Sequence, residues 1–297
     1  MFRIFGTILA ARLGLAFGSF LNVCLSRWPE DESIVHPRSH CRHCEHTLSW
    51  WENIPLLSWL ILRGRCRSCR TPIGLRYPLV ELSIGVLWAF LAWQSLTGQW
   101  DPDSSLLDYF FAVQFVLGRA IFYWLLIALA VFDAEDLWLP DLVVLPGLAL
   151  GFVFTVVEFV GFRHDSADVF EFVRYGIYGA VLQRILAILL AAALILLIRW
   201  LYKLIRHREG IGLGDAKLMA LLAAWLGLPA TLLAFAIGTV LGAIAGLVVI
   251  AVPAARTDQQ SWATSKLPLG TFLCIGGIIS SFWGQPIIAA YLRLAGF

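Results

Sequence analysis

The sequence predicts an all-α polytopic membrane protein with about eight transmembrane helices and a small zinc-binding loop domain between the first two. Its composition is the first observation: of the 297 residues, 60% are hydrophobic and only 14% are charged. A soluble globular domain carries about 25% charged residues. The second observation is that the hydrophobic residues form long runs, which excludes an ordinary soluble enzyme, a disordered chain and a coiled coil.

Eight apolar segments define the predicted helices. A helix that crosses the ~30 Å hydrocarbon core needs about 20 apolar residues. The sixth segment is at the lower limit of this length, and the thirteen Trp and twenty Phe of the chain are typical of interfacial aromatic belts. The segments lie at about 2–25, 77–97, 106–132, 140–161, 178–201, 214–228, 230–252 and 268–294.

The distribution of Lys and Arg predicts the orientation, because basic residues are enriched in cytoplasmic loops. The alternate loops 27–76, 199–217 and 254–267 hold fifteen Lys and Arg, whereas the opposite loops and both termini hold four. We therefore expect the three basic loops in the cytoplasm and both termini outside. The net charge of +2 gives no indication of nucleic-acid binding.

Four cysteines occur in the first basic loop as two close pairs. Cys41 and Cys44 form one C-x2-C pair, and Cys66 and Cys69 form another after twenty-one intervening residues. Two such pairs can place four thiolates around one Zn²⁺. The alternative is two disulfides, which a reducing cytoplasmic loop disfavours, so we expect zinc. Three nearby histidines could compete as ligands: His40, His43 and His46.

The segment between the cysteine pairs, 50–62, reads WWENIPLLSWLIL. It is too short and too polar to span a bilayer. Its three Trp favour a position in the headgroup region, and a buried core of the zinc domain is an equal alternative. Cys24 and Cys274 stand alone in predicted spans, and we expect them to be packed apolar residues.

Carboxylates gather at two predicted membrane boundaries. Residues 131–141, VFDAEDLWLPD, contain four acids, and 211–217, IGLGDAK, contain Asp215. By the order of spans, Asp133 ends the third span and Asp215 begins the sixth, so both fall at the cytoplasmic face. Two carboxylates that approach each other at an apolar boundary have split pKa values, so that one stays protonated. Such a pair can activate water against an amide carbonyl, as aspartic proteases do.

Other interpretations of these acids stay open on residue type and spacing alone. They could be solvated loop charges, or they could bind a divalent cation. Gly212-x-Gly214 before an acid also resembles a nucleotide-binding turn, but that turn needs a preceding strand, and here a basic loop leads into an apolar helix. Lys217 follows Asp215 closely, and we expect it to act on that carboxylate or to hold loop carbonyls. Gly238, Gly242 and Gly246 predict a close-packing helix face.

A string of motifs resembles one known family over nearly the whole chain. In order these are GSFLNVCLSRWP, the paired C-x2-C motifs, NIPLLSWL, RCRSCRTPIGLRYPLVEL, D-x6-PD from Asp133 to Asp141, GLGDAKL and LPLGTFL. Together they resemble the bifunctional type IV prepilin peptidases, the leader peptidase/N-methyltransferases of pili and type II secretion. Two stretches depart from the usual wording: LPLGTFL replaces P-F-G-P-F, and IGLRYP replaces I-S-x-R-Y-P. Neither departure touches the aspartates or cysteines.

The resemblance implies a multi-pass aspartic endopeptidase of the bacterial inner membrane with its active site facing the cytoplasm. It would remove the short basic leader of prepilins or pseudopilins after a Gly. It would then methylate the new N-terminal residue with S-adenosylmethionine. The family's catalytic aspartates fall on Asp133 and Asp215, and its structural zinc ligands fall on four cysteines: Cys41, Cys44, Cys66 and Cys69.

The expected division of the chain has three parts: a first transmembrane helix at 1–26, a cytoplasmic zinc-binding tetracysteine domain at 27–76, and a seven-helix membrane aspartic peptidase domain at 77–297. No soluble methyltransferase fold fits in the remaining sequence, so the methyl donor would bind within the membrane assembly or beside the zinc domain. Two rival functions remain. A transporter could use intramembrane charges such as Arg184, although we find no internal repeat. A noncatalytic zinc-bearing assembly factor would tolerate loss of both aspartates.

Overall fold

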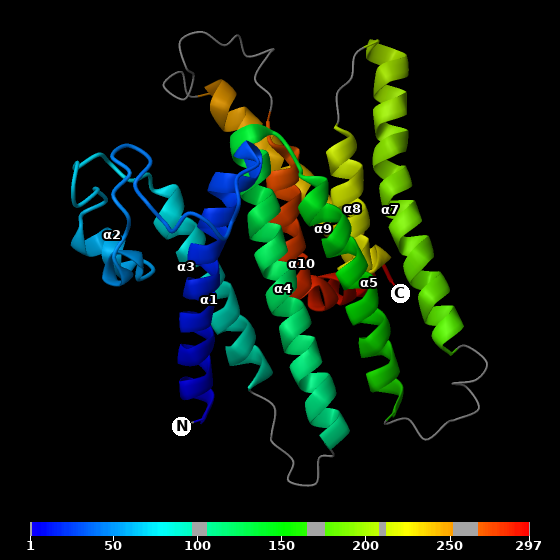
Figure 1. Ribbon diagram of the computed structural model, residues 1–297. Helices are drawn as coiled ribbons and strands as arrows, with labels where there is room; N and C mark the ends of the chain where they lie inside the picture. The colour runs from blue at the N-terminus through cyan, green and yellow to red at the C-terminus, as the bar shows by residue number, and fades with distance from the viewer. Residues whose placement is uncertain (1, 97–105, 165–175, 208–211, 252–266, 297) are drawn as a thin grey trace. The chain divides into compact units, whose positions relative to one another are not determined.

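The computed structural model describes residues 2–96, 106–164, 176–207, 212–251 and 267–296. Within these ranges the chain consists of α-helices and short 3₁₀ turns, with two isolated bridges and no longer strand (Figure 1). The predicted all-α class is therefore confirmed. Four of the basic residues counted above lie outside the described residues: Arg174, Arg208, Arg256 and Lys266.

Each of the eight predicted spans coincides with a helix. Seven helices of the described chain are long and apolar enough to cross a membrane. The sixth predicted span is a helix of only 14 residues, about 21 Å long at 1.5 Å per residue, which is less than the hydrocarbon core. The helices are α1 (Phe2–Arg27), α3 (Arg76–Ser95), α4 (Leu106–Asp136), α5 (Asp141–His164), α7 (Ile177–Arg206), α8 (Leu213–Leu226), α9 (Leu228–Ala251) and α10 (Leu269–Leu294).

The described chain forms two compact units, Met1–Ala128 and Leu129–Phe297. In the first unit, α1 and α3 approach closely at glycines one helical turn apart. A Cβ on Gly18 would lie 2.6 Å from the Cα of Glu81, and one on Gly14 would lie 2.8 Å from the carbonyl oxygen of Ile84. Small residues at this spacing let helix backbones meet. The contact places Glu81 against α1.

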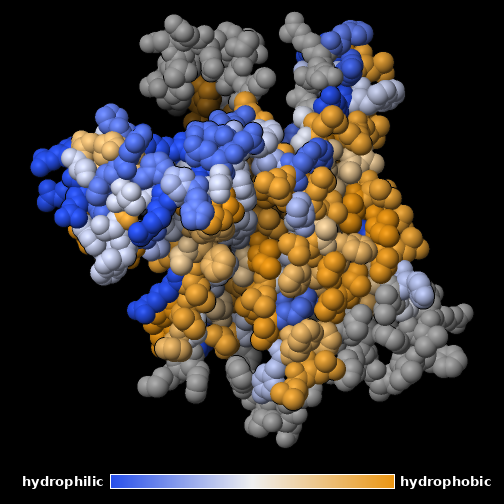
Figure 2. Space-filling view, viewed as in Figure 1, coloured by the Kyte–Doolittle hydropathy of each residue, from blue (hydrophilic) through white to orange (hydrophobic). Residues whose placement is uncertain are grey.

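The segment between α1 and α3 carries the cysteines and has little regular structure: η1 (Trp28–Glu30), η2 (Trp50–Asn53) and α2 (Leu57–Ile61). Hydrophilic residues gather over it, whereas hydrophobic residues cover most of the visible face of α7 below its hydrophilic C-terminal end (Figure 2). Trp50, Leu60 and Ile61 are exposed, so a buried core does not account for the whole stretch between the cysteine pairs. Its position in the headgroup region stays a prediction.

In the second unit, α8 is enclosed by protein, since ten of its residues are buried. Polar contacts fix its C-terminal end. The indole Nε1 of Trp225 donates to the carbonyl of Gly147 at 2.9 Å, and the Thr155 hydroxyl donates to Ala224 at 3.1 Å. Arg184 of α7 donates to the carbonyl of Ala223 at 3.2 Å. A helix that is hydrophobic all round is covered either by protein or by lipid. Around most of α8 the cover is protein.

The predicted glycine face of α9 packs against α10. A Cβ on Gly238 would come 3.0 Å from the carbonyl oxygen of Phe272, and one on Gly242 would meet the ring of the same residue at 3.3 Å. The close-packing prediction is confirmed. The expected packing of the two isolated cysteines also holds, because Cys24 and Cys274 are both fully buried.

Candidate active site and metal centre

Asp133 lies in the last turns of α4 with only 6% of its surface exposed. Its carboxylate meets the start of α10. The backbone N–H of Thr271 donates to Asp133 Oδ2 at 2.7 Å, and the backbone of Gly270 also contacts the carboxylate. The first N–H groups of a helix have no partner within the helix and favour an anion. Asp133 therefore caps α10 from another helix.

Two residues at this helix start shape the aspartate's surroundings. A Cβ on Gly270 would lie 2.9 Å from the Cγ of Asp133, so a glycine is needed for the approach. The Thr271 hydroxyl lies 2.9 Å from the carbonyl oxygen of Ala130 and 3.3 Å from Asp133 Oδ2. Its single proton serves one of these acceptors at a time. We did not predict either residue as part of the site, although Pro268 followed by a Gly-Thr pair is a helix-start signal.

Asp215 lies in the first turn of α8 with 9% of its surface exposed. The backbone N–H of Gly212 donates to its Oδ2 at 3.2 Å. Gly214 gives room for a neighbour, because a Cβ there would come 3.1 Å from the Cδ1 of Leu139. Like Asp133, this carboxylate lies at a helix N-terminus, which stabilises its negative charge.

Asp133 and Asp215 both lie in the second unit. The charge of Asp133 acts on Asp215, and both charges act on the buried Cys274. Because both aspartates are more than nine-tenths buried, solvated loop charges do not describe them. Glu135 and Asp136 are exposed in the last turn of α4. That the two buried aspartates share one proton and activate water stays a prediction.

Lys217 contributes to α8 in a different way from the one expected. Its Nζ lies 2.6 Å from Asp141 Oδ1, in a pair whose side chains are each about half exposed. The expectation that it acts on Asp215 is therefore wrong, because the cation joins the start of α5 instead. Exposed pairs of this kind contribute about 0–1 kcal/mol to stability.

The four predicted metal ligands also come together. Their Sγ atoms all lie within 4.8 Å of one another, and this quartet is the one group of three or more potential metal ligands among the described residues. Sγ–Sγ distances are 3.8 Å for Cys41 and Cys69 and 3.9 Å for Cys44 and Cys66. All four are free thiols, with no disulfide. A tetrahedron with Zn–S bonds of about 2.3 Å has edges of about 3.8 Å, so the quartet fits zinc.

The two cysteine pairs share one local backbone geometry. The N–H of Cys41 donates to the carbonyl five residues later at 2.9 Å, and the N–H of Glu45 returns to Cys41 at 2.8 Å. The second pair repeats both bonds, with Cys66 donating at 2.9 Å and Arg70 returning at 3.0 Å. Glu45 and Arg70 have matching positive φ angles of 55° and 59°. Two equivalent turns thus present two thiols each.

One of the competing histidines is engaged elsewhere. His46 Nε2 lies 3.3 Å from Glu52 Oε2, and the backbone N–H of Ser49 donates to the same oxygen at 2.8 Å. The Ser49 N–H is the main cause that holds the pKa of the Glu52 carboxyl below its ordinary value. No histidine belongs to the metal-ligand group found among the described residues. The geometry therefore favours a ligand set of four cysteines.

These features define a polytopic α-helical membrane protein with a buried pair of carboxylates and a tetracysteine centre. Residues 13–95 match the bacterial peptidase A24 N-terminal domain, and residues 120–247 match the type IV leader peptidase family. The chain belongs to the type IV leader peptidase family. No solved structure matches it significantly.

Three relatives carry the name prepilin leader peptidase/N-methyltransferase. The protein of Stutzerimonas stutzeri is 32% identical over 95% of this chain and 92% of its own length. That of Pseudomonas putida is 35% identical over 97% and 94%. That of Burkholderia pseudomallei strain 1026b is 36% identical over 96% and 86%. The match extends across both compact units.

Proposed function

We propose that this chain is an aspartic peptidase that removes the leader of prepilins or pseudopilins and then N-methylates the new N-terminus with S-adenosylmethionine. The observation that carries the peptidase is the pair of buried aspartates, Asp133 and Asp215, each held at a helix N-terminus. The names of the relatives support the substrate and the methyl transfer. The chain is a bacterial inner-membrane protein in this proposal.

Cleavage uses the two carboxylates as an acid and a base around one water. The ionised aspartate takes a proton as the water oxygen bonds to the scissile carbonyl carbon, and the protonated aspartate gives its proton to the carbonyl oxygen. The tetrahedral carbon then expels the amine, which receives a proton as the C–N bond breaks. The enzyme forms no covalent bond with the substrate, and the shared proton returns to the pair.

The position of the site fits a substrate with a basic leader and an apolar helix. The basic loops of the sequence favour a cytoplasmic location for the aspartates. Glu135 and Asp136 are exposed beside Asp133 and contribute negative charge at the entrance. Charges of this sign attract a leader rich in Lys and Arg, while the apolar part of the substrate stays in the bilayer.

One zinc ion is held by four thiolates in this proposal: Cys41, Cys44, Cys66 and Cys69. When bound, the ion supplies a cross-link between the two cysteine turns. Four cysteines leave no open coordination position, so the centre is structural. The turns then hold the segment between the cysteine pairs against the rest of the first unit.

Methyl transfer requires a free amine and an aligned donor. The amine nitrogen bonds to the methyl carbon as the C–S bond breaks, and the bonding pair stays on sulfur, which becomes a neutral thioether. The nitrogen then loses a proton to water. Alignment supplies most of the acceleration in such a step, so no special protein nucleophile is needed.

The peptidase proposal is tested by cleavage of a prepilin-like peptide with purified protein. Asp133→Asn and Asp215→Asn keep the side-chain shape but cannot exchange the proton, so cleavage should fall by about 10³-fold or more. Asp31→Asn is the matched control, because it makes the same change at an exposed acid of the first unit. Full cleavage by either buried variant would remove that residue from the mechanism. Cleavage by neither variant nor wild type would favour the noncatalytic assembly factor.

A further inference from the structure

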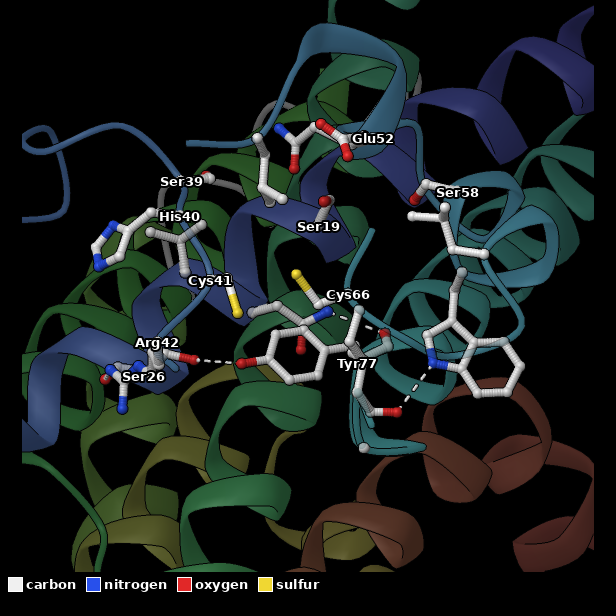
Figure 3. A pocket seen from close by; sticks show the side chains of 18 of the residues that line it. Ser19, Ser26, Ser39, His40, Cys41, Arg42, Glu52, Ser58, Cys66 and Tyr77 are labelled. Atoms are coloured by element: carbon white, nitrogen blue, oxygen red, sulfur yellow. Dashed lines mark hydrogen bonds between the residues drawn. The ribbon is translucent and has the colours of Figure 1, made fainter. Parts of the chain in front are cut away.

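A cavity of about 320 Å³ lies entirely within the first unit, between the C-terminal half of α1, the start of α3 and the tetracysteine segment (Figure 3). Cys41, Cys66 and Tyr77 are among its lining residues. Small-molecule sites occupy about 300–1,000 Å³ and carry a few convergent polar groups on apolar walls. The cavity has the volume of such a site, and the peptidase aspartates are not part of it.

Two polar atoms of the lining residues are buried without a hydrogen-bond partner: Glu52 Oε1 and Asn22 Oδ1. Glu52 is 6% exposed and Asn22 is 3% exposed. Their remaining polar atoms are fixed, since Glu52 Oε2 accepts from Ser49 N–H at 2.8 Å and Asn22 Nδ2 donates to the Tyr77 carbonyl at 2.9 Å. Buried acceptors are normally paired. Two acceptors beside one cavity thus receive no hydrogen bond from the described protein.

Three charged residues that line the cavity are buried: Arg27, Glu52 and Glu81. The Arg27 guanidinium donates to the backbone carbonyls of Ser33 and Pro37, so it does not neutralise the two carboxylates by a direct ion pair.

Glu81 of α3 is 8% exposed and accepts from the N–H of Leu56 at 2.7 Å. Among the described residues it has no ion-pair partner within 4.0 Å. Glu52 and Glu81 are two buried carboxylates that each accept a backbone N–H, with His46 as a further contact of Glu52 and Ser19 of Glu81. Such groups favour a cationic ligand, because it neutralises a charge that is costly to bury alone.

Two aromatic side chains line the same cavity and are held in place. The Trp59 indole donates to the Ile73 carbonyl at 3.2 Å, and the Tyr77 hydroxyl lies 3.3 Å from the Ser26 hydroxyl. Rigid aromatic faces suit a flat heterocycle or a positively charged group. Arg67 also lines the cavity, with its guanidinium 4.9 Å from the centre of the Trp51 ring. It supplies a positive charge for a ligand carboxylate.

We propose that this cavity binds S-adenosylmethionine, an inference that rests on the methyltransferase function proposed above. The donor carries a sulfonium, an ammonium, a carboxylate and a flat adenine. Glu52 and Glu81 neutralise its positive charges, Arg67 pairs with its carboxylate, and the aromatic rings cover the adenine. The zinc centre forms part of the wall through Cys41 and Cys66, so the metal maintains the donor site without reacting.

The test is direct binding of S-adenosylmethionine and S-adenosylhomocysteine to the purified, zinc-loaded full chain by titration calorimetry. The two ligands differ by the methyl group and the sulfonium charge. Glu81→Gln and Glu52→Gln remove a charge and keep the shape, so affinity for S-adenosylmethionine should fall at least about tenfold. The variant of the carboxylate that faces the sulfonium should lose much less affinity for the neutral thioether, since that sulfur carries no charge. The variant of the carboxylate that faces the ammonium should lose affinity for both ligands, since both carry this group.

Two further variants complete the design. Glu45→Gln makes the same change at an exposed position of the same segment that does not line the cavity, and it should bind both ligands as wild type does. Ser19→Leu fills the cavity from α1 and should abolish binding of both ligands. A zinc content of one per chain and an unchanged unfolding temperature identify the variants that have folded.

The outcomes separate this inference from the proposed function. If wild type neither binds the donor nor methylates a peptide, the methyltransferase function fails and the cavity assignment fails with it. If wild type methylates but the three cavity variants bind the donor normally, the function stands and the donor site lies elsewhere. Equal losses of both ligands in both folded Glu→Gln variants would overturn the placement of a carboxylate at the sulfonium.

Discussion

Asp133 and Asp215 are buried without a Lys or Arg among the hydrogen-bond partners found in the described chain, and their charges are met by backbone N–H groups instead. A helix N-terminus carries roughly half a positive charge. Unlike a basic side chain, it cannot move into the site or take up the shared proton. In the proposed mechanism this arrangement leaves the proton between the two carboxylates, where water activation needs it.

Thr271 offers a test of how closely Asp133 must be held. Thr271→Val keeps the volume and the backbone N–H but removes the hydroxyl that reaches Ala130 and Asp133. Hydrogen bonds to charged groups are worth about 1.5–3 kcal/mol, so kcat for leader cleavage should fall about 10- to 100-fold with little change in KM. Steady-state cleavage of a prepilin-like peptide measures both constants.

Thr271→Ser is the matched control, because it restores the hydroxyl and should return kcat to near the wild-type value. A purely structural role would lower stability without separating kcat from KM. If the Val variant cleaves at the wild-type rate while folded, the hydroxyl does not position the aspartate, and the backbone N–H is sufficient.

Sequence spacing predicted the two aspartates but not their surroundings. Asp133 and Asp215 were identifiable from the order of the predicted spans and from the motifs of the family that the chain resembles. Thr271 was not, because its contact with Asp133 joins positions 138 residues apart. The error over Lys217 has a simple cause: residues two apart on a helix face different directions, so adjacency to Asp215 did not mean contact.

At the scale of elements, the two cysteine turns repeat the same hydrogen bonds and present their thiols as a closed group. We expect purified protein to contain about one zinc per chain, because one four-ligand site accounts for all four thiols. Cys44→Ser should lose the metal and unfold the segment between the pairs, because binding and folding are coupled. Elemental analysis and limited proteolysis measure the two effects.

Cys24→Ala is the control for this experiment, since Cys24 is buried in α1 and lies outside the quartet. It should keep one zinc per chain and resist proteolysis as wild type does. Two disulfides and no metal in non-reducing mass spectrometry would contradict the zinc centre. Zinc retained at full occupancy by the Cys44→Ser variant would show that this thiol is not a ligand.

The helix α8 gives the second element-scale prediction. Trp225 is 4% exposed, donates to Gly147 and stacks on Phe154 with ring centroids 5.7 Å apart. Trp225→Phe keeps an aromatic ring but leaves the Gly147 carbonyl without this donor, which should lower the free energy of unfolding by about 1–3 kcal/mol. Unfolding in detergent with increasing denaturant measures the change. Trp283→Phe, at a partly exposed position on α10, should have a smaller effect.

The sequence predicted α8 as a helix but not that ten of its 14 residues are buried. Apolar residues face lipid in one helix and protein in another, and composition does not distinguish the two. The 14-residue length was the available signal, since it falls short of the hydrocarbon core. Equal stability of the Trp225 variant and wild type would mean that the indole hydrogen bond is replaced by another donor.

At the scale of the whole molecule, the two candidate sites belong to different compact units. The cysteine quartet and the cavity beside it lie in Met1–Ala128, whereas the aspartate pair lies in Leu129–Phe297. The predicted division into 1–26, 27–76 and 77–297 is a functional one and stays a prediction. Separate sites allow one reaction to be lost without the other.

We therefore expect Asp215→Asn to methylate a pre-cut peptide that begins with Phe, although it no longer removes a leader. The amide replaces a carboxylate of nearly the same shape at the start of α8, so the fold should be kept. It changes none of the residues that line the cavity in the first unit. The measurement is donor-dependent methylation of a synthetic mature N-terminus, at a rate close to that of wild type.

The cysteine variants are the counterpart of this experiment. Cys44→Ser should lose methylation through loss of zinc, because the turns that carry Cys41 and Cys66 also line the proposed donor cavity. Cleavage by Cys44→Ser should fall only if the substrate needs the tetracysteine segment. Comparison of the cleavage rates of this variant and of wild type measures that need. If folded Asp215→Asn protein cannot methylate a peptide that wild type methylates, the two reactions are coupled through Asp215 and the separation of the sites does not separate the chemistry.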